Sequence, residues 1–175
     1  MTSPEQLRSF IRDVPDFPKP GIVFKDITPL LHSPMALDKT MEWLAEPFRD
    51  EGITNVVAIE SRGFIFGSCV ARALNAGFVP IRKPGKLPWN CRRHEYVLEY
   101  GKDILEIHDD ALTPDDRVIV VDDVLATGGT AAAAASLVHG FGAKLIGLAM
   151  VIELSFLEGR RKLDANTKIH TLLQY

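Results

Sequence analysis

Two adjacent carboxylates and a glycine turn carry the most specific chemistry in this sequence. Asp122 and Asp123 follow the apolar run 118–121, and Thr127-Gly128-Gly129-Thr130 leads into the alanine-rich segment 131–135. Such a turn at the start of a helix binds anions, because its backbone N–H groups are unpaired and the helix dipole is positive there. The two threonines of the turn add hydroxyl donors. The pattern predicts a phosphate site beside a pair of acids, suited to a phosphorylated ribose.

The two carboxylates repel a phosphate, so we expect them to face a different part of the ligand. Asp122 and Asp123 are expected to end the strand and to accept hydrogen bonds from two ribose hydroxyls. The main chain from Ala126 to Thr130 would then hold the 5′-phosphate, with Thr130 capping the helix. The turn lacks the lysine of a Walker loop and is not G-x-G-x-x-G. The alternative is a strand end with two solvated acids.

A second segment repeats the order strand, turn, helix. Residues 56–59 are apolar, and Glu60-Ser61-Arg62-Gly63-Phe64 follows them. Neighbouring parallel strands end at one edge of a sheet, so we expect both loops there. Backbone N–H groups and the forked donors of Arg62 suit a diphosphate. The alternative for Arg62 is a surface or salt-bridged arginine.

Basic residues are concentrated between positions 82 and 93, in a segment rich in proline and glycine. This composition predicts that residues 84–93 are mobile. A hairpin of residues 96–100 and 104–108, turning at Gly101-Lys102, is expected to follow. A solvated face is the alternative for the last two arginines. No role is assigned to Trp89, Cys91, Arg92 and Arg93.

Together these segments resemble the motifs of the type I phosphoribosyltransferases. Residues 118–130 are similar to the family's signature for phosphoribosyl pyrophosphate (PRPP), and residues 60–64 to its diphosphate loop, which commonly holds a non-proline cis peptide. Four further blocks, at 18–30, 82–88, 98–101 and 172–175, narrow the resemblance to the members that use adenine. The resemblance covers nearly the whole chain.

The resemblance implies one α/β domain over residues 1–175, with a central, mostly parallel sheet flanked by helices. Residues 1–33 would form an amino-terminal hood with the base-binding loop, and residues 84–100 a mobile hairpin lid. The implied reaction is purine salvage, in which adenine and PRPP give AMP and diphosphate. The implied cofactor is Mg²⁺, held mainly by PRPP rather than by protein ligands. A homodimer is implied, with part of the basic group acting across its interface.

The resemblance also implies roles for single residues. Glu99 would be the general acid/base, although a lone glutamate in a hairpin usually faces solvent. Arg62 and Lys86 would stabilise the departing diphosphate. Adenine would lie between Phe24 and Leu154, with core packing as the alternative for Phe24. The remaining contacts to PRPP or AMP would come from Ser61, Arg82, Lys83, Tyr100, Asp122, Asp123, Ala126, Thr127, Gly128, Gly129 and Thr130. The main chain of Val23 and Lys25 would pair with the base edge, and the family usually has arginine where this chain has Lys25.

Composition limits the size of the core, the general classes of partner and the cellular location. The chain has 175 residues, 46% hydrophobic and 25% charged, with a net charge of −3, so we expect a sizeable core and no general attraction to nucleic acids or membranes. Without an apolar leader or membrane-length run, a cytoplasmic location is expected. Cys69 and Cys91 are expected as free thiols, and the five histidines show no metal-ligand spacing.

The rest of the pattern predicts alternating strands and helices, typical of a parallel sheet. Strands are expected at 55–60, 78–83, 117–122, 143–153 and 168–173. Helices are expected at 4–13, 34–50, 64–75, 130–140 and 156–162, with Pro47 ending or kinking the second. The proline-rich segment 14–29 is expected as an ordered loop rather than a strand.

Two other functions stay open. The same scaffold could use hypoxanthine, guanine, xanthine or orotate, which turnover with a panel of bases would separate. The second alternative is a regulator that senses PRPP or nucleotides without catalysis. Such proteins often carry an added DNA-binding domain or a basic face, whereas this chain is short for the first and shows no clear case of the second.

Overall fold

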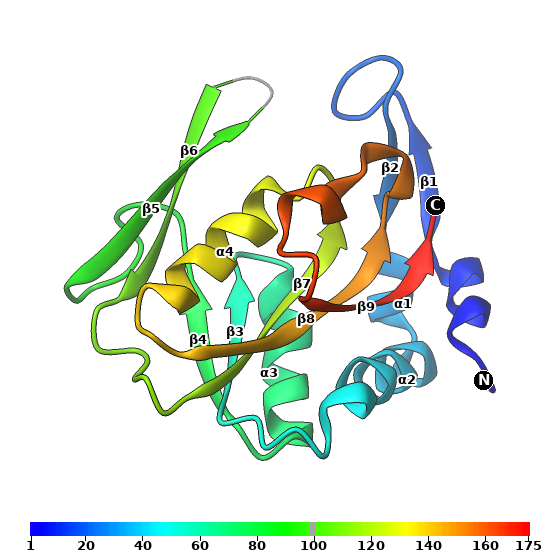
Figure 1. The fold of residues 1–175 in the computed structure, drawn as a ribbon. Coiled ribbons are helices and arrows are strands. Elements are labelled where there is room, and N and C mark those ends of the chain that lie inside the picture. Colours follow the sequence, from blue (N-terminus) through cyan, green and yellow to red (C-terminus); the bar gives the residue numbers. More distant parts are fainter. Residues whose placement is uncertain (99–100) are drawn as a thin grey trace.

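A five-stranded parallel sheet organises the protein (Figure 1). The computed structural model describes residues 1–98 and 101–175. Across the sheet the strands follow the order β4 (Gly77–Ile81), β3 (Asn55–Ile59), β7 (Arg117–Leu125), β8 (Lys144–Glu153) and β9 (Lys168–Gln174). The central strands are apolar along almost their whole length, as expected where helices cover both faces. The predicted α/β class with a central parallel sheet is confirmed.

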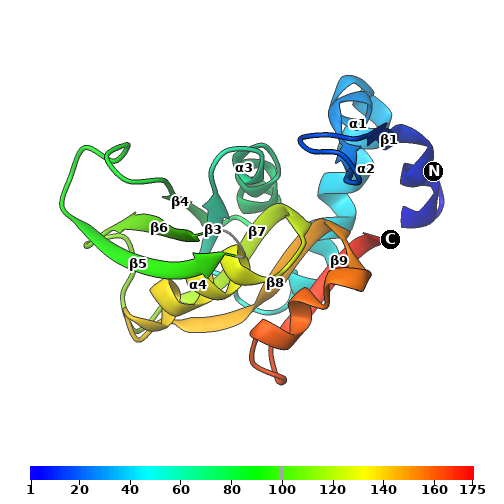
Figure 2. The ribbon, with the colours of Figure 1, turned by 90° about the horizontal axis from the view of Figure 1, so that it is seen from above.

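Helices cover the two faces of this sheet separately, as Figure 2 shows from above. On one face lie α2 (Pro34–Ala45) and α3 (Gly63–Ala73), and on the other lies α4 (Gly129–His139). A hydrophobic core lies on each face of the sheet, and alternate residues of β7 pack into one core or the other because side chains of a strand point to opposite faces. Ile119 packs with α2 and α3, and Val120 packs with α4.

The crossover helices explain where the two loops lie. Helix α3 joins β3 to β4, and α4 joins β7 to β8. Strands β3 and β7 are parallel neighbours, paired from Asn55 with Val118 to Ala58 with Val121. Both helices begin just after the carboxyl end of the preceding strand, so both loops open at one edge, as predicted.

The amino-terminal segment corrects one expectation. Residues 14–29 are not a continuous loop, because β1 (Arg12–Pro15) and β2 (Val23–Asp26) pair as an antiparallel hairpin. Pro18 and Pro20 lie in the connection, where no ladder hydrogen bond is needed from them. The Gly21 N–H donates to the Asp16 carboxylate at 2.8 Å and closes this turn. The first helix, a 3-10 helix (Pro4–Phe10), is therefore shorter than predicted.

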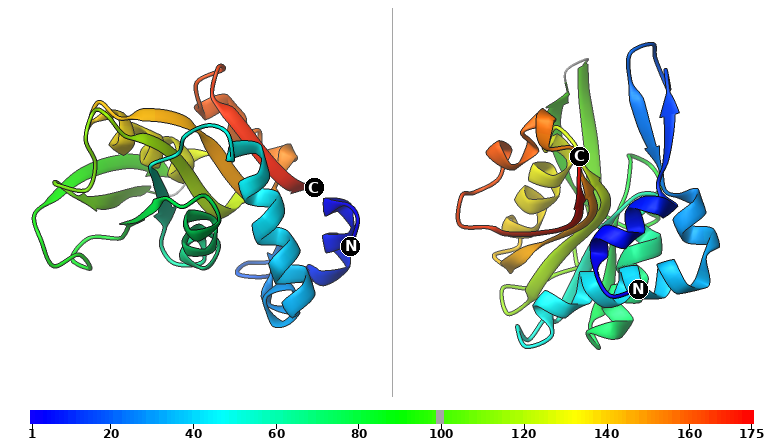
Figure 3. Two further views of the ribbon diagram at one scale, coloured as in Figure 1. Left: turned by 90° about the horizontal axis from the view of Figure 1, so that it is seen from below. Right: turned by 90° about the vertical axis from the view of Figure 1, so that its right-hand side faces the viewer.

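A second hairpin, β5 (Cys91–Leu98) and β6 (Gly101–His108), stands on the other side of the sheet edge (Figure 3). It begins within the predicted lid, and Gly101 pairs with Leu98, so the predicted turn at Gly101-Lys102 is wrong. Two arginines that received no role from the sequence support this hairpin, Arg93 between its strands and Arg92 against the segment after α4. The Arg92 guanidinium lies 3.8 Å from the Phe141 ring centroid, and Arg93 forms an ion pair of 2.6 Å with Glu106.

The shorter helices complete the chain. The structure has α1 (Thr28–His32) and three further 3-10 helices, η2 (Glu46–Phe48), η3 (Ser155–Leu157) and η4 (Gly159–Lys162). Helix α2 ends at Ala45 and η2 contains Pro47, which confirms the predicted break. Within the described residues, we find no helix with the length and hydropathy required to cross a bilayer.

Candidate active site

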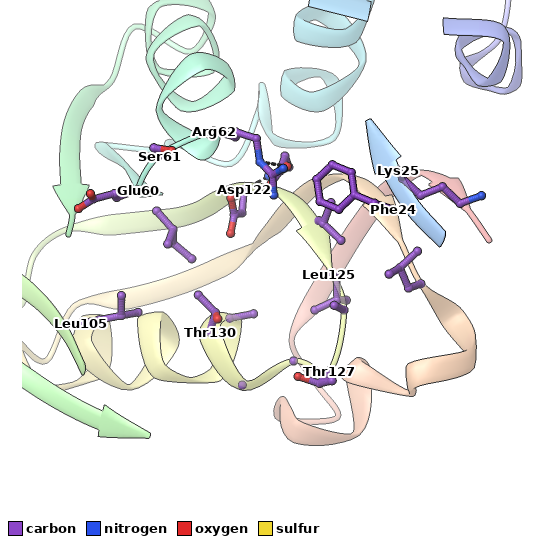
Figure 4. Close-up of a pocket in the computed structure, with 18 of the residues that line it drawn as sticks. Phe24, Lys25, Glu60, Ser61, Arg62, Leu105, Asp122, Leu125, Thr127 and Thr130 are labelled. Atoms are coloured by element: carbon purple, nitrogen blue, oxygen red, sulfur yellow. Dashed lines mark hydrogen bonds and ion pairs between the residues drawn. The ribbon is translucent and has the colours of Figure 1, made fainter. Parts of the chain in front are cut away.

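A cavity of about 620 Å³ opens at the carboxyl edge of the sheet (Figure 4). Strand β2, the loops after β3 and β7, the start of α4 and the end of β8 all contribute to its lining. The structure brings together fourteen residues predicted for the site: Val23, Phe24, Lys25, Ser61, Arg62, Lys83, Asp122, Asp123, Ala126, Thr127, Gly128, Gly129, Thr130 and Leu154. Arg82 and Lys86 are not part of the lining, and Glu99 and Tyr100 lie outside the described residues.

The glycine turn delivers main-chain amides to one end of this cavity. Gly128 has a φ of 78°, in the left-handed region that favours glycine, and α4 begins at Gly129 without a side-chain cap. The first-turn N–H groups of a helix have no intrahelical acceptor, so they are available to an anion. Thr130 belongs to this first turn, so its predicted capping role is wrong. Its hydroxyl instead lies 3.3 Å from that of Tyr96.

The acid pair lies within a strand, not after one. Strand β7 continues through both carboxylates to Leu125, which pairs with Glu153 of β8, so the expectation that the acids end the strand is wrong. Asp123 is 4% exposed, and its N–H donates to the Asp122 carboxylate at 2.8 Å. Burial, and then the charge of Asp123, raises the pKa of Asp122 well above its usual range.

Arg62 joins the two loops. Its Nε lies 2.7 Å from Oδ2 of Asp123, and its guanidinium carbon lies 5.3 Å from the centroid of the Phe24 ring (Figure 4). One side chain thus touches an acid of the β7 segment and the aromatic wall of β2. The peptide bond between Glu60 and Ser61 is cis, as the family resemblance implied for this loop.

Glu60 gathers the basic residues beside the cavity. It accepts hydrogen bonds from Nζ of Lys86, from Nε of Arg82 at 3.2 Å and from the Lys83 N–H at 2.9 Å. Burial opposes ionisation, but the hydrogen bonds, first that of Lys86, lower the pKa of Glu60 below its usual value. Lys83 is also paired through its side chain with Asp103. Of the cations predicted for the diphosphate, the structure therefore places Arg82 and Lys86 around Glu60, while the Lys83 side chain is paired with Asp103.

The opposite end of the cavity is apolar. Phe24 and Leu154 both contribute to the lining, and the Phe24 ring is braced edge-on by Phe17 at a centroid distance of 5.3 Å. The Lys25 side chain points away from the cavity (Figure 4). Its Nζ lies 2.6 Å from the Asp13 carboxylate and 4.0 Å from the Tyr175 ring centroid. Only the main chain of Lys25 is left for a ligand.

Sequence reasoning assigned no role to several lining residues. Most adjoin a motif residue, and their position next to that motif was the available signal. Leu105 comes from β6 and has no local signal, because only the tertiary fold brings that strand to the cavity. The full set is Ile22, Ile59, Glu60, Leu105, Val124, Leu125 and Ala131.

Fold and cavity together define a class of α/β protein that binds phosphorylated ligands with paired loops at the carboxyl ends of adjacent strands. The family profile of the phosphoribosyl transferase domain matches residues 26–171. A curated adenine phosphoribosyltransferase from Anaeromyxobacter dehalogenans is 55% identical over 98% of this chain and 99% of its own length.

Solved structures agree. The crystal structure of the adenine phosphoribosyltransferase from Rhodothermus marinus matches with a TM-score of 0.94 and 53% identity, covering 99% of both chains. The Saccharomyces cerevisiae enzyme, complexed with adenine and an imino-altritol bisphosphate, has a TM-score of 0.91 and 43% identity, covering 97% of this chain and 98% of its own. This chain belongs to the phosphoribosyltransferase family and, within it, to the adenine phosphoribosyltransferases.

Proposed function

We propose that this protein transfers the 5-phosphoribosyl group of PRPP to adenine, giving AMP and diphosphate. The observation that carries the proposal is the single cavity in which a main-chain anion site, an acid pair, an arginine loop and an apolar slot meet. Their order matches a ligand with a 5′-phosphate, ribose hydroxyls, a diphosphate and a planar base. The yeast relative, with its adenine and bisphosphate ligand, supports this assignment.

The sugar donor is held by main chain at one end and by acids at its centre. The first-turn amides of α4, with the hydroxyls of Thr127 and Thr130, bind the 5′-phosphate. Asp122 and Asp123 accept hydrogen bonds from the two ribose hydroxyls. Because Arg62 is paired with Asp123, donor binding frees this arginine, which then turns to the diphosphate.

The departing diphosphate is stabilised by positive charge. Ser61 and Arg62 approach it from the loop after β3, and Lys83 from the segment after β4. Arg82 and Lys86, held beside the cavity by Glu60, complete the binding when the lid over residues 84–100 closes. Fixed charges aimed at the leaving group lower the barrier without reorganisation during the reaction.

Adenine lies between Phe24 and Leu154, and the main chain of Val23 and Lys25 pairs with its edge. A 6-oxo purine reverses the donor and acceptor pattern at that edge, so it would leave buried polar groups unpaired. The reaction proceeds through a sugar cation with little bonding to either partner, so positioning dominates. Glu99 handles the proton of the base, and Tyr100 packs beside the donor.

Mg²⁺ suits this site as an ion bound to the substrate. Within residues 1–98 and 101–175, no group of three or more His, Cys, Asp or Glu side chains could hold a metal. Asp122 and Asp123 offer carboxylate oxygens close to the ribose, and the donor supplies phosphate and hydroxyl oxygens, which Mg²⁺ prefers along with water. The bound ion would supply charge neutralisation to the leaving diphosphate.

The organisation of the protein is part of the proposal. Residues 1–175 form one domain with a hood at 1–33 and a mobile lid at 84–100. The protein acts as a cytoplasmic homodimer in which part of the basic group serves the partner's site. Light scattering on the purified protein would give a monomer mass if the dimer assignment were wrong.

The activity is tested with purified protein, Mg²⁺ and PRPP against adenine, hypoxanthine, guanine, xanthine and orotate, following nucleotide and diphosphate by chromatography. We expect AMP and diphosphate in equal amounts from adenine alone. A nucleotide from another base would correct the base assignment. PRPP binding by calorimetry without turnover of any base would favour the sensor instead.

A further inference from the structure

The backbone of Gly159 rests directly on the glycine turn before α4. A Cβ atom built on Gly159 would lie 2.2 Å from the carbonyl oxygen of Ala126 and 2.9 Å from the nitrogen of Gly128. A Cβ atom on Gly128 would lie 2.1 Å from the carbonyl oxygen of Gly159. Real Cβ atoms do not approach this closely, so the two chain segments touch through bare main chain.

An ion pair between the buried Glu153 and the partly exposed Arg160 fixes the segment that contains Gly159. Arg160 donates from Nε to Oε1 of Glu153 at 2.6 Å and from Nη2 to Oε2 at 2.7 Å, which is the forked geometry of a strong pair. Oε2 of Glu153 also accepts from Thr171 at 3.0 Å and from Gln174 at 3.2 Å. Helix η4 is thereby tied to the ends of β8 and β9.

The charge of Glu153 depends on this network. Its residue is 5% exposed, and the hydrogen bond from Arg160, as the largest cause, lowers the pKa of Glu153 below its usual value. Removing Arg160 would leave a buried carboxylate without its main partner, which is costly. The segment would then have to move to admit water.

The same network adjoins the base side of the cavity. Leu154 directly follows Glu153 and contributes to the lining. Its N–H donates to the Leu125 carbonyl at 2.9 Å, and the next N–H, of Ser155, donates to the Tyr175 carbonyl at 2.8 Å. The short helices that follow, drawn in orange beside the start of α4 in Figure 1, lead the chain from the base wall to the phosphate loop.

We propose that Gly159 and the Glu153–Arg160 ion pair are positioning residues of the transfer reaction. They fix the path of residues 126–128 against that of Leu154, and so set the distance between the 5′-phosphate and the base. Neither the ion pair nor Gly159 touches substrate, and the inference rests on the proposed function. A positional error of about 1 Å costs up to about a hundredfold in rate, which makes such a brace measurable.

The test compares Gly159→Ala and Arg160→Gln with a matched control, Arg161→Gln. Arg161 is the next residue, and its ion pair of 2.8 Å with Glu158 lies at the surface, where its side chain is 77% exposed. For Gly159→Ala we expect the KM for PRPP to rise about tenfold, with the KM for adenine unchanged within about twofold. For Arg160→Gln both KM values should rise, because Leu154 is displaced as well. Arg161→Gln should match the parent.

Further readouts separate positioning from loss of structure. The dissociation constant of ribose 5-phosphate, measured by calorimetry, should rise in parallel with the KM for PRPP. Arg160→Lys should recover part of the lost affinity. Should either variant fail to fold, Thr171→Val removes a single donor to Glu153 and leaves the forked Arg160 pair in place. This variant should stay folded with a modest fall in Tm and should raise both KM values about twofold. A lower Tm with parent KM values and parent ribose 5-phosphate affinity in the folded variants would overturn the inference. A parent protein that makes no AMP would instead overturn the proposed function.

Discussion

The Nε atom of Arg62 lies 2.7 Å from Oδ2 of Asp123, so the arginine assigned to the diphosphate is paired with an acid assigned to the ribose. Arg62 lies in the loop after β3 and Asp123 lies within β7, and they meet because these two strands are parallel neighbours. A donor that binds both must displace this ion pair. Under the proposed function, ribose recognition and capture of the leaving group are therefore physically coupled.

Replacing Arg62 tests that coupling. We expect Arg62→Gln to lower kcat/KM for PRPP by about a hundredfold or more, because an aligned cation is lost and Asp123 is left without its partner. Steady-state kinetics measures the effect. Arg72→Gln is the control, since this exposed arginine lies in the last turn of α3, the helix that begins directly after Arg62. Equal losses in the two variants would contradict the assignment.

Glu60 should act through the cations that it holds. Glu60→Gln removes the negative charge that gathers Arg82, Lys86 and the Lys83 N–H. We expect kcat/KM for PRPP to fall about tenfold, with ribose 5-phosphate affinity unchanged because that ligand has no diphosphate. Glu46→Gln, which breaks a surface pair with Arg49, is the control and should leave both quantities as they are. A weakened ribose 5-phosphate affinity in Glu60→Gln would show that the effect is not confined to the diphosphate side.

The contact at Gly128 predicts a stability difference between two glycines with nearly the same φ angle. Gly128 and Gly85 have φ values of 78° and 77°, but only at Gly128 would a Cβ atom meet other atoms within 4 Å. Both alanine variants should lose about 1–2 kcal/mol from the left-handed conformation. Gly128→Ala should lose about 1–3 kcal/mol more from overpacking, measured by urea unfolding. Equal losses at the two positions would mean that the phosphate loop yields to the added methyl group.

The Glu153 network predicts a pH dependence of stability. The pKa of Glu153 is lower in the folded protein than its ordinary value of 4.5, so its contribution is complete above that value and is lost as the pH falls toward the folded pKa. The difference in free energy of unfolding between the parent and Glu153→Gln should therefore be constant from pH 7 to about 5 and shrink below that. Urea unfolding at a series of pH values measures it. A difference that grows on acidification would have the wrong sign.

The sequence predicts those parts of the protein that are encoded locally. The strands β3 and β7 are continuous apolar runs, each followed by a distinctive turn, so both loops and their common edge were predictable. The hairpin of β1 and β2 was missed because its prolines suggested a loop, while the pairing of Asp13 with Lys25 becomes visible only in the fold. Likewise, β7 was cut short because the acids look like a strand end.

Residues whose partners are far along the chain were beyond prediction. Glu60 received no role because its contacts, Arg82 and Lys86, come from a segment after the next strand. Gly159 carries no motif, and its close approach to Gly128 becomes visible only in the fold. The expectations for Glu99 and Tyr100 lie outside the described residues and stay predictions.

In the proposed complex, the two ends of the ligand are bound mainly by different parts of the polypeptide, the main chain at the phosphate and a side chain at the base. In the proposed complex the 5′-phosphate is held mainly by main-chain amides around Gly128, with the hydroxyls of Thr127 and Thr130 as the side-chain donors, so side-chain replacement can alter this end of the site only slightly. At the base end the wall is a side chain, Phe24, on a two-stranded hairpin outside the main sheet. Under the proposed function, preference among nucleobases can therefore change in evolution or be redesigned through this hairpin, while recognition of the sugar phosphate changes little.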